Sequence, residues 1–469
     1  MYNGSRDIRR IWCKMNEKNI EVFETMKISR AVAKMAVPSI LGMLVTIAYN
    51  IADTMFVSWT GDPNQVAAVS IATPVFMLLM AVGNVFAVGG GTFISRLLGK
   101  KQYETVKTIS AICIYGSAAF GVLAAVLYII FKEKLLMAVG TSSQTYDFAK
   151  QYLDWISMGA FFVTLQFALG GIIRAEGSAK YAVRGMMLGT VLNIILDPIF
   201  ILKMDLGCSG AAIATIIGNI ASCIYYFHYI LTKQTFLCAN IKALKPTKAL
   251  VLEIVTVGLP SSITNTLMSL SNILMNICLV TYGDNAVASM GIAMKAMTLV
   301  ILVQIGLAGG LQPLIAYNFA AHNFKRMDGI LRTGILWNVC IGISLTILYM
   351  IFTPQIVRIF INDEEILIQG AKFLRRLVSP GPIVGIMFVF QFGLQAMGKA
   401  LATLFLAVSR QGIIFVPILL ISNRFFGLNG IVWAQPVADF VSTFTAIILF
   451  TVNVKKSMKS IQSKTQEVV

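Results

Sequence analysis

The sequence predicts an all-α integral membrane protein with twelve transmembrane helices in two six-helix lobes related by a parallel internal repeat. Composition gives the class: 57% of the 469 residues are hydrophobic, only 13% are charged, and mean hydropathy is +0.78. A soluble domain carries about a quarter charged residues. Segment length gives the helix number, because apolar stretches of about 20 residues recur twelve times. Sequence similarity between the two halves of the chain predicts that each half forms one six-helix lobe.

The first half contains six stretches long enough to cross a bilayer, and six more follow in the second half. Within the second half, the stretch 354–379 between the ninth and tenth spans is amphipathic and not a clean loop. The expected spans are 35–59, 66–93, 109–131, 152–173, 185–202, 207–231, 250–282, 287–319, 330–352, 378–397, 400–422 and 428–452.

Four segments of the first half recur about 220 residues later, which indicates duplication. The pairs are WTGDPNQVAAVS at Trp59 with TYGDNAVAS at Thr281, VGGGTFISRLLGKKQYE at Val88 with AGGLQPLIAYNFAAHNFKR at Ala308, RAEGSA at Arg174 with QAMGKA at Gln395, and GCSGAAIAT at Gly207 with GLNGIVWAQ at Gly427. Because each half has an even number of spans, the second half enters the membrane in the same direction as the first. The repeat is therefore parallel, about an axis along the membrane normal.

Basic residues set the expected topology. With the N-terminus inside, the inside segments hold 27 of the 38 Lys and Arg residues, which places both termini in the cytoplasm. The net charge of +17 is spread over short segments and forms no recognised basic-aromatic module, so we exclude nucleic acid as a partner. The expected domains are an amphipathic N-terminal segment 1–34, an N-lobe 35–232, a lysine-rich linker 233–249, a C-lobe 250–454 and a tail 455–469.

Residues for catalysis or for a structural metal are scarce. The seven cysteines have no metal-ligand or redox spacing, and only two histidines are present. An enzyme embedded in the membrane would need a nucleophile with a base or a metal cluster, so we expect no enzyme and no cofactor. The glycine run at Gly89 lacks the ending of a phosphate loop and fits close helix packing. The chain also has no ATP motif, so any transport by this protein must be driven by an ion gradient.

One acidic residue stands out within the fifth span. Asp197 follows an apolar run, and Asn193 lies one turn earlier on the same helical face. Pro198 lacks an N–H, which frees the carbonyl of Ile194 and favours a kink. An acid in the hydrocarbon region costs roughly 2.5 to 3.5 kcal/mol and usually has a function, although a structural hydrogen-bonded role is the alternative.

Two further spans place polar residues at the same depth as Asp197. Tyr49 and Asp53 lie one turn apart in the first span, and Thr215 lies in the sixth. Asp53, Asp197 and Thr215 are each about 9 Å from the outer end of their span. Burial and like charge both disfavour two ionised carboxylates, so this pair is suited to take up H⁺ or to hold Na⁺ between oxygens. Ordinary interhelical hydrogen bonding is the alternative for Tyr49 and Thr215.

The second half has no matching acid pair, because positions 53 and 197 correspond to about Met275 and Ile418. It carries Lys295, Arg410 and Asp439 near the midplane of their spans. Either Asp439 forms a structural ion pair with one of the cations, or these charges contact substrate. Three glutamines, Gln166, Gln304 and Gln391, either line a cavity or link helices.

These motifs together resemble the multidrug and toxic compound extrusion (MATE) family, most closely its bacterial MepA-like branch near the DinF type. The resemblance runs from about Lys27 to Val454. It is carried by Pro38 with YNIAD, GGGTFISRLLG, RAEGSAK, LNIILDPIFI, GAAIAT, IAYNF and SRQG. It implies an exporter with two lobes around a central cavity, a first-lobe ion site matching Tyr49, Asp53, Asn193, Asp197 and Thr215, and bending of the first helix at Pro38.

We therefore expect a monomeric multidrug exporter of the bacterial inner membrane. It would exchange organic cations or drugs for H⁺ or Na⁺ by alternating access and would confer resistance to antibiotics and other xenobiotics. The alternative is a flippase for lipids or lipid-linked oligosaccharides of the same broad superfamily. That function predicts a strongly cationic cavity, for which Lys295 and Arg410 are the only indications.

Overall fold

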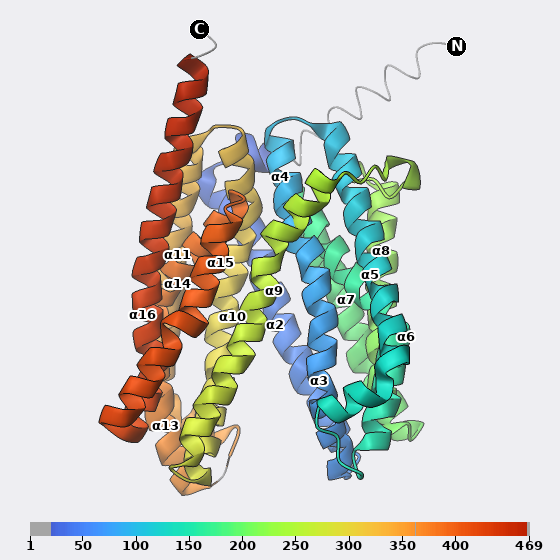
Figure 1. Ribbon diagram of the computed structural model, residues 1–469, viewed down its shortest axis with the longest axis vertical. Coiled ribbons are helices and arrows are strands. Elements are labelled where there is room, and N and C mark those ends of the chain that lie inside the picture. The colour runs from blue at the N-terminus through green and yellow to red at the C-terminus, as the bar shows by residue number, and fades with distance from the viewer. Residues whose placement is uncertain (1–19, 362, 467–469) are drawn as a thin grey trace. The chain divides into compact units, whose positions relative to one another are not determined.

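The computed structural model describes residues 20–361 and 363–466, and within these ranges the chain is helical and contains no strand (Figure 1). Within the described residues, ten helical stretches are long and apolar enough to cross a membrane. An eleventh span is made by two helices that bend by 48° at a short break, Glu364–Val378 and Gly381–Ala396. The first nineteen residues of the expected N-terminal segment lie outside the described residues.

The twelfth span lies within the longest of the ten stretches. Ala400–Met458 is 59 residues long, more than twice what one bilayer crossing requires. It is interrupted at Gly427, whose backbone is not helical (φ 56°, ψ −139°). The stretch therefore contains two spans, which brings the total to the predicted twelve. The amphipathic stretch before Gly381 forms two helices, α12 (Thr353–Arg358) and α13 (Glu364–Val378).

The duplication is visible in the backbone as well as in the sequence. Each of the four motif pairs carries a residue with positive φ at an equivalent place, 220 to 222 positions apart. These pairs are Gly61 (73°) with Gly283 (94°), Lys101 (58°) with His322 (59°), Gly177 (92°) with Gly398 (73°), and Gly207 (50°) with Gly427 (56°). Left-handed backbone is uncommon outside glycine, so its recurrence at matched positions confirms the predicted internal repeat.

Two compact units make up the chain. Unit 1 extends to Ser262 and also contains Ala316–His322, and unit 2 contains Ile263–Ile315 and the chain from Asn323 onward. The long helices α9 (Lys248–Val280) and α10 (Asp284–Ala320) therefore contribute residues to both units.

Unit 1 is built from the six spans of the first half, and in Figure 1 α5 and α6 run side by side. Two of the six spans contain a π-helical segment, η1 and η2. The elements are α2 (Ile28–Ser58), α3 (Pro63–Asn84), η1 (Val85–Gly90), α4 (Gly91–Gly99), α5 (Tyr103–Ala138), α6 (Tyr146–Ala175), α7 (Ala179–Pro198), η2 (Ile199–Lys203), α8 (Gly207–Thr232) and a short 3₁₀ turn, η3 (Ile241–Ala243).

Small residues let α9 approach the glycine run of unit 1 closely, as the sequence indicated. A Cβ at Gly89 would lie 2.0 Å from the Ile254 carbonyl oxygen, and one at Gly258 would lie 2.2 Å from that of Val85. Neither position can hold a larger residue without a backbone shift. About two turns after Gly89, on α4, Arg96 forms a 2.7 Å ion pair with Glu253.

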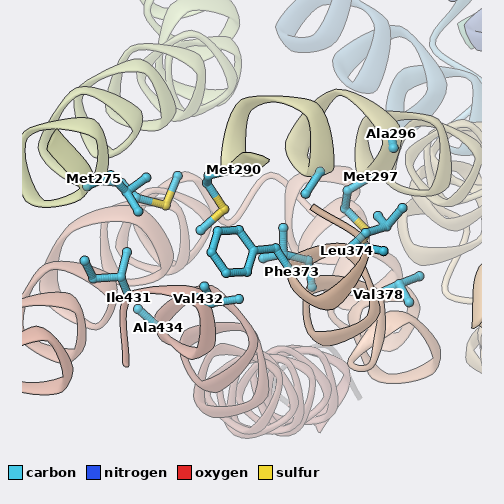
Figure 2. Packing of buried hydrophobic residues seen from close by; sticks show 14 of the residues in the cluster. Met275, Met290, Ala296, Met297, Phe373, Leu374, Val378, Ile431, Val432 and Ala434 are labelled. Carbon is cyan, nitrogen blue, oxygen red and sulfur yellow. The ribbon is translucent and has the colours of Figure 1, made fainter. Parts of the chain in front are cut away.

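Unit 2 contains the remaining helices, α11 (Phe324–Ile351), α12, α13, α14 (Gly381–Ala396), α15 (Ala400–Val408), the π-helical η4 (Ser409–Ile413) and α16 (Phe415–Gln466). Figure 2 shows the centre of its apolar core. The ring of Phe373 on α13 lies between Met290 and Met297 of α10 on one side and Val432 of α16 on the other. The apolar face of the amphipathic α13 is thus buried in the core of this unit.

Candidate functional site

A chain of polar side chains from three helices of unit 1 lies where the sequence predicted a cluster. The hydroxyl of Tyr49 on α2 and that of Thr215 on α8 share a hydrogen bond of 3.2 Å. The amide nitrogen of Asn193 on α7 lies 3.4 Å from the Thr215 hydroxyl and 3.3 Å from Oδ1 of Asp197. Asn193, Asp197 and Thr215 are buried, and Tyr49 is half-buried.

Asp53 completes the cluster from α2, one turn beyond Tyr49. It lies close enough to Asp197 for the two carboxylates to interact electrostatically. Its Oδ1 is buried without a hydrogen-bond partner, and the same is true of Oδ2 of Asp197 and Oδ1 of Asn193. Neither carboxylate forms an ion pair within the described part of the chain. Three buried oxygen acceptors therefore receive no hydrogen bond from the described part of the chain.

Glycine and proline positions explain how α7 and α8 bring these groups together. The two helices cross at Gly189 and Gly218, where a Cβ on either residue would lie within 2.6 Å of the other's carbonyl oxygen. Asn193 is one turn from this crossing, so its amide reaches α8. Immediately after Asp197, α7 ends at Pro198 and continues as the π-helical η2. A π segment beside a polar site is common where a helix is adapted for function.

Tyr152 on α6 also belongs to this cluster, although sequence reasoning did not select it. The residue is 7% exposed and interacts electrostatically with Asp53, Asp197 and Tyr49. It is the first residue of the fourth expected span, 152–173, whereas the other residues lie about 9 Å inside their spans, and a tyrosine at a membrane interface is common. The observed helix begins six residues earlier, at Tyr146, which places Tyr152 at a similar depth.

In unit 2 the buried acid has a cationic partner. Arg410 Nε on η4 lies 2.9 Å from Oδ1 of Asp439 on α16, and both side chains are less than a tenth exposed. Gln435 donates a second hydrogen bond of 2.9 Å to the same oxygen, and the guanidinium lies 5.2 Å from the ring centroid of Phe388. Of the two alternatives left open by the sequence, the structure places Asp439 in an ion pair, and its partner is Arg410.

The other residues predicted to line a substrate cavity differ in burial and in hydrogen bonding. Gln304 donates to the Gly381 carbonyl oxygen at 2.7 Å and links α10 to the start of α14. Gln166 on α6 is buried with its Oε1 unpaired. Gln391 is half-buried and Lys295 is exposed. The described chain contains no group of three or more His, Cys, Asp or Glu side chains that could hold a metal ion.

Another buried acid lies just outside the spans and was not predicted as a functional residue. Glu176, within RAEGSA, is fully buried and accepts hydrogen bonds from Tyr229, Thr235 and the backbone N–H of Phe236. Burial raises the pKa of its carboxyl to about 7, although the three hydrogen bonds oppose the shift. Thr235 and Phe236 belong to the linker between the halves, so Glu176 anchors the linker to unit 1.

Comparison with known proteins places the fold among transporters. The MatE family model matches two segments of the chain, residues 38–199 and 260–421. The multidrug export protein MepA of Staphylococcus saprophyticus is 33% identical over 435 residues, which cover 93% of this chain and 96% of that protein. MepA of Staphylococcus aureus strain NCTC 8325 is 33% identical over 439 residues with the same coverage.

Solved structures agree with this assignment at the level of the fold. A structure described as the outward-facing conformation of a multidrug resistance MATE family transporter superimposes with a TM-score of 0.90. That match has 24% identity and covers 94% of this chain and 99% of the other. A transporter from Pyrococcus furiosus, described as having a binding pocket of reverse polarity, gives a TM-score of 0.89 at the same identity and coverage.

Proposed function

Because the chain belongs to the MATE family of multidrug efflux transporters, we propose that it is a secondary active exporter that exchanges organic cations for H⁺ or Na⁺. It would act as a monomer in a bacterial inner membrane, with both termini in the cytoplasm. Its cargo would be small-molecule drugs and other xenobiotics, and it would need no cofactor beyond the coupling ion.

The observation that carries this proposal is the set of unpaired oxygens in unit 1. Buried polar atoms are normally satisfied, and a buried anion normally has a cationic partner. Asp53, Asp197 and Asn193 each present a buried oxygen that has no hydrogen-bond partner. A proton on one carboxyl, or Na⁺ held by these oxygens, would satisfy the site. A cation site that the protein leaves incomplete is what ion coupling requires.

Ion binding drives export only if the ion's affinity differs between the two conformations. We propose that neutralisation of Asp53 and Asp197 from outside removes the negative charge that holds a cationic drug, and the drug leaves. The ion is then released inside, and the charged site binds drug again. Pro38, which lies within the continuous helix α2, is the residue at which this helix would bend, and Pro198 with η2 would allow α7 to adjust.

The flippase alternative receives no support from the cations on which it depended. The charge of Arg410 is neutralised by Asp439. Of the two cations that the sequence offered, only Lys295 is then left for a charged cavity. Lys295, Gln166 and Gln391 remain candidates for contact with substrate, while Gln304 is already engaged between helices.

The test is drug efflux from proteoliposomes with pH and Na⁺ gradients imposed separately. One gradient should drive export in the wild type. Asp53→Asn and Asp197→Asn should each abolish it, because neither amide can bind a proton or neutralise a cation. Asp284→Asn, which changes an exposed acid at the start of α10, is the matched control and should transport normally. Export at the wild-type rate in both site mutants would refute the proposal.

A further inference from the structure

We infer that unit 1 carries a binding site for the phosphate group of an anionic membrane phospholipid, formed by the linker between the halves and the first turns of α5. The site is a cavity of about 550 Å³. None of its lining residues belongs to the acid cluster, which consists of Tyr49, Asp53, Tyr152, Asn193, Asp197 and Thr215, and the site does not depend on the transport function proposed above. Lys107 and Thr108 of α5 line one side, and Asn240, Lys242 and Lys245 of the linker line the other.

The linker wall of the cavity is held in place by specific bonds to unit 1. Ser110 on α5 accepts from the Cys238 backbone N–H at 2.9 Å, and Tyr115 donates to the Ala239 carbonyl oxygen at 2.8 Å. The ring of Phe236 stacks on Tyr103 with centroids 5.0 Å apart. Asn240 then caps η3 through the Lys242 backbone N–H. The cavity is therefore formed before any ligand binds, which lowers the cost of binding.

The charge of the lining favours an anion. The linker from Lys233 to Lys248 contains four lysines and no acid. Glu104 is the one acidic residue that lines the cavity, and it pairs with Lys107 at 2.7 Å. Lys242 and Lys245 have no acidic partner in the described chain. The N-terminal end of α5 adds the positive end of a helix dipole, with no side-chain cap on its first N–H groups.

The position of the cavity favours a lipid over a free anion. Its walls include the first turns of α5 and Leu250 in the first turn of α9, which are both membrane-spanning helices. The ligand would therefore sit at the depth of lipid headgroups. Exposed apolar residues lie close to lining residues in the sequence, namely Ile241 on η3 and Leu252 on α9, at 64% and 59% exposure. These apolar side chains would favour contact with acyl chains near the site. Basic pockets between membrane helices on the cytoplasmic side bind anionic headgroups in the same way.

The experiment compares two variants that lose the same charge. Lys242→Gln with Lys245→Gln removes two lysines of the cavity, and Lys180→Gln with Lys233→Gln removes two that do not line it. Binding of phosphatidylglycerol and of phosphatidylcholine to the detergent-purified full chain is measured by native mass spectrometry. Sodium phosphate serves as competitor. Thermal unfolding of both variants reports whether they fold as the wild type does.

We expect the wild type to prefer phosphatidylglycerol, the cavity variant to bind it roughly tenfold more weakly, and the control variant to bind it as the wild type does. Equal loss in both variants would show a diffuse surface effect and overturn the inference. Equal binding of the two lipids would overturn it as well. Complete displacement by an equal concentration of inorganic phosphate would assign the cavity to free phosphate instead. None of these results bears on ion coupling at Asp53 and Asp197.

Discussion

The two units each bury an aspartate, but they treat its charge in opposite ways. Asp197 in unit 1 has an amide donor and a second carboxylate nearby, while Asp439 in unit 2 has a guanidinium and an amide bonded to one oxygen. At the positions of unit 2 that correspond to Asp53 and Asp197, Met275 lies in the apolar core (Figure 2) and Ile418 packs against it. Duplication preserved the backbone, and the polar sites diverged on it. An acid left without a counter-ion is available for ion exchange, whereas one that is already paired holds helices together.

Removal of single charges should separate these roles most strongly. Arg410→Ala leaves a buried carboxylate with one amide donor, so we expect a loss of about 3 to 5 kcal/mol in unfolding free energy. Asp197→Asn removes an uncompensated buried charge and should leave stability equal or higher. Thermal unfolding in detergent measures both variants.

The matched control for Arg410→Ala is the double variant Arg410→Met with Asp439→Leu, which removes both charges at once. Replacement of a buried ion pair by apolar residues is often neutral. The double variant should therefore unfold near the wild-type temperature and still export drug. A double variant that is folded but inactive would show that the pair takes part in transport. The buried aspartate of unit 2 would then have more than a structural role.

Smaller changes in the acid cluster should tune ion binding without abolishing it. Thr215→Val removes the hydroxyl that links Tyr49 and Asn193, and the loss of these bonds should weaken ion binding roughly tenfold. The measurement is the pH or Na⁺ concentration at half-maximal efflux. Thr443→Val is the matched control in unit 2, where the hydroxyl bonds only its own helix. An equal shift in the control would mean that the cluster has no special link to the ion.

The sequence predicted the spans, the repeat and the convergence of Tyr49, Asn193, Asp197 and Thr215, because apolar length, motif spacing and depth along a helix can all be counted. Their role in ion coupling stays a prediction. Depth alone does not tell which way a helix is rotated. Lys295 and Arg410 lie at similar depth in their spans, yet only Arg410 faces Asp439, and Lys295 is exposed.

Other features depend on contacts that no local pattern encodes. Pro198 indicated a distortion where η2 begins, but no single residue signals the π-helical segments η1 and η4, which change the register of their helices. Glu176 lies in a motif that the sequence identified, but its burial is caused by the linker, which folds back some sixty residues later. The equivalent position in the second half is Met397, so the repeat itself gave no reason to expect an acid with a function there.

The smallest expected effect concerns Glu176. Because burial raises the pKa of Glu176 to about 7, the folded protein binds a proton that the unfolded chain releases near pH 4.5. Its contribution to stability is therefore largest below about pH 4.5 and is lost as pH rises toward 7. Wild-type unfolding temperature should fall from pH 5.5 to pH 8 by a few degrees more than that of Glu176→Gln. Glu104→Gln, at an exposed acid of α5, is the control and should keep the wild-type pH dependence. If Glu176→Gln keeps it as well, the buried carboxyl does not change its protonation between pH 5.5 and pH 8, and its pKa does not lie near 7.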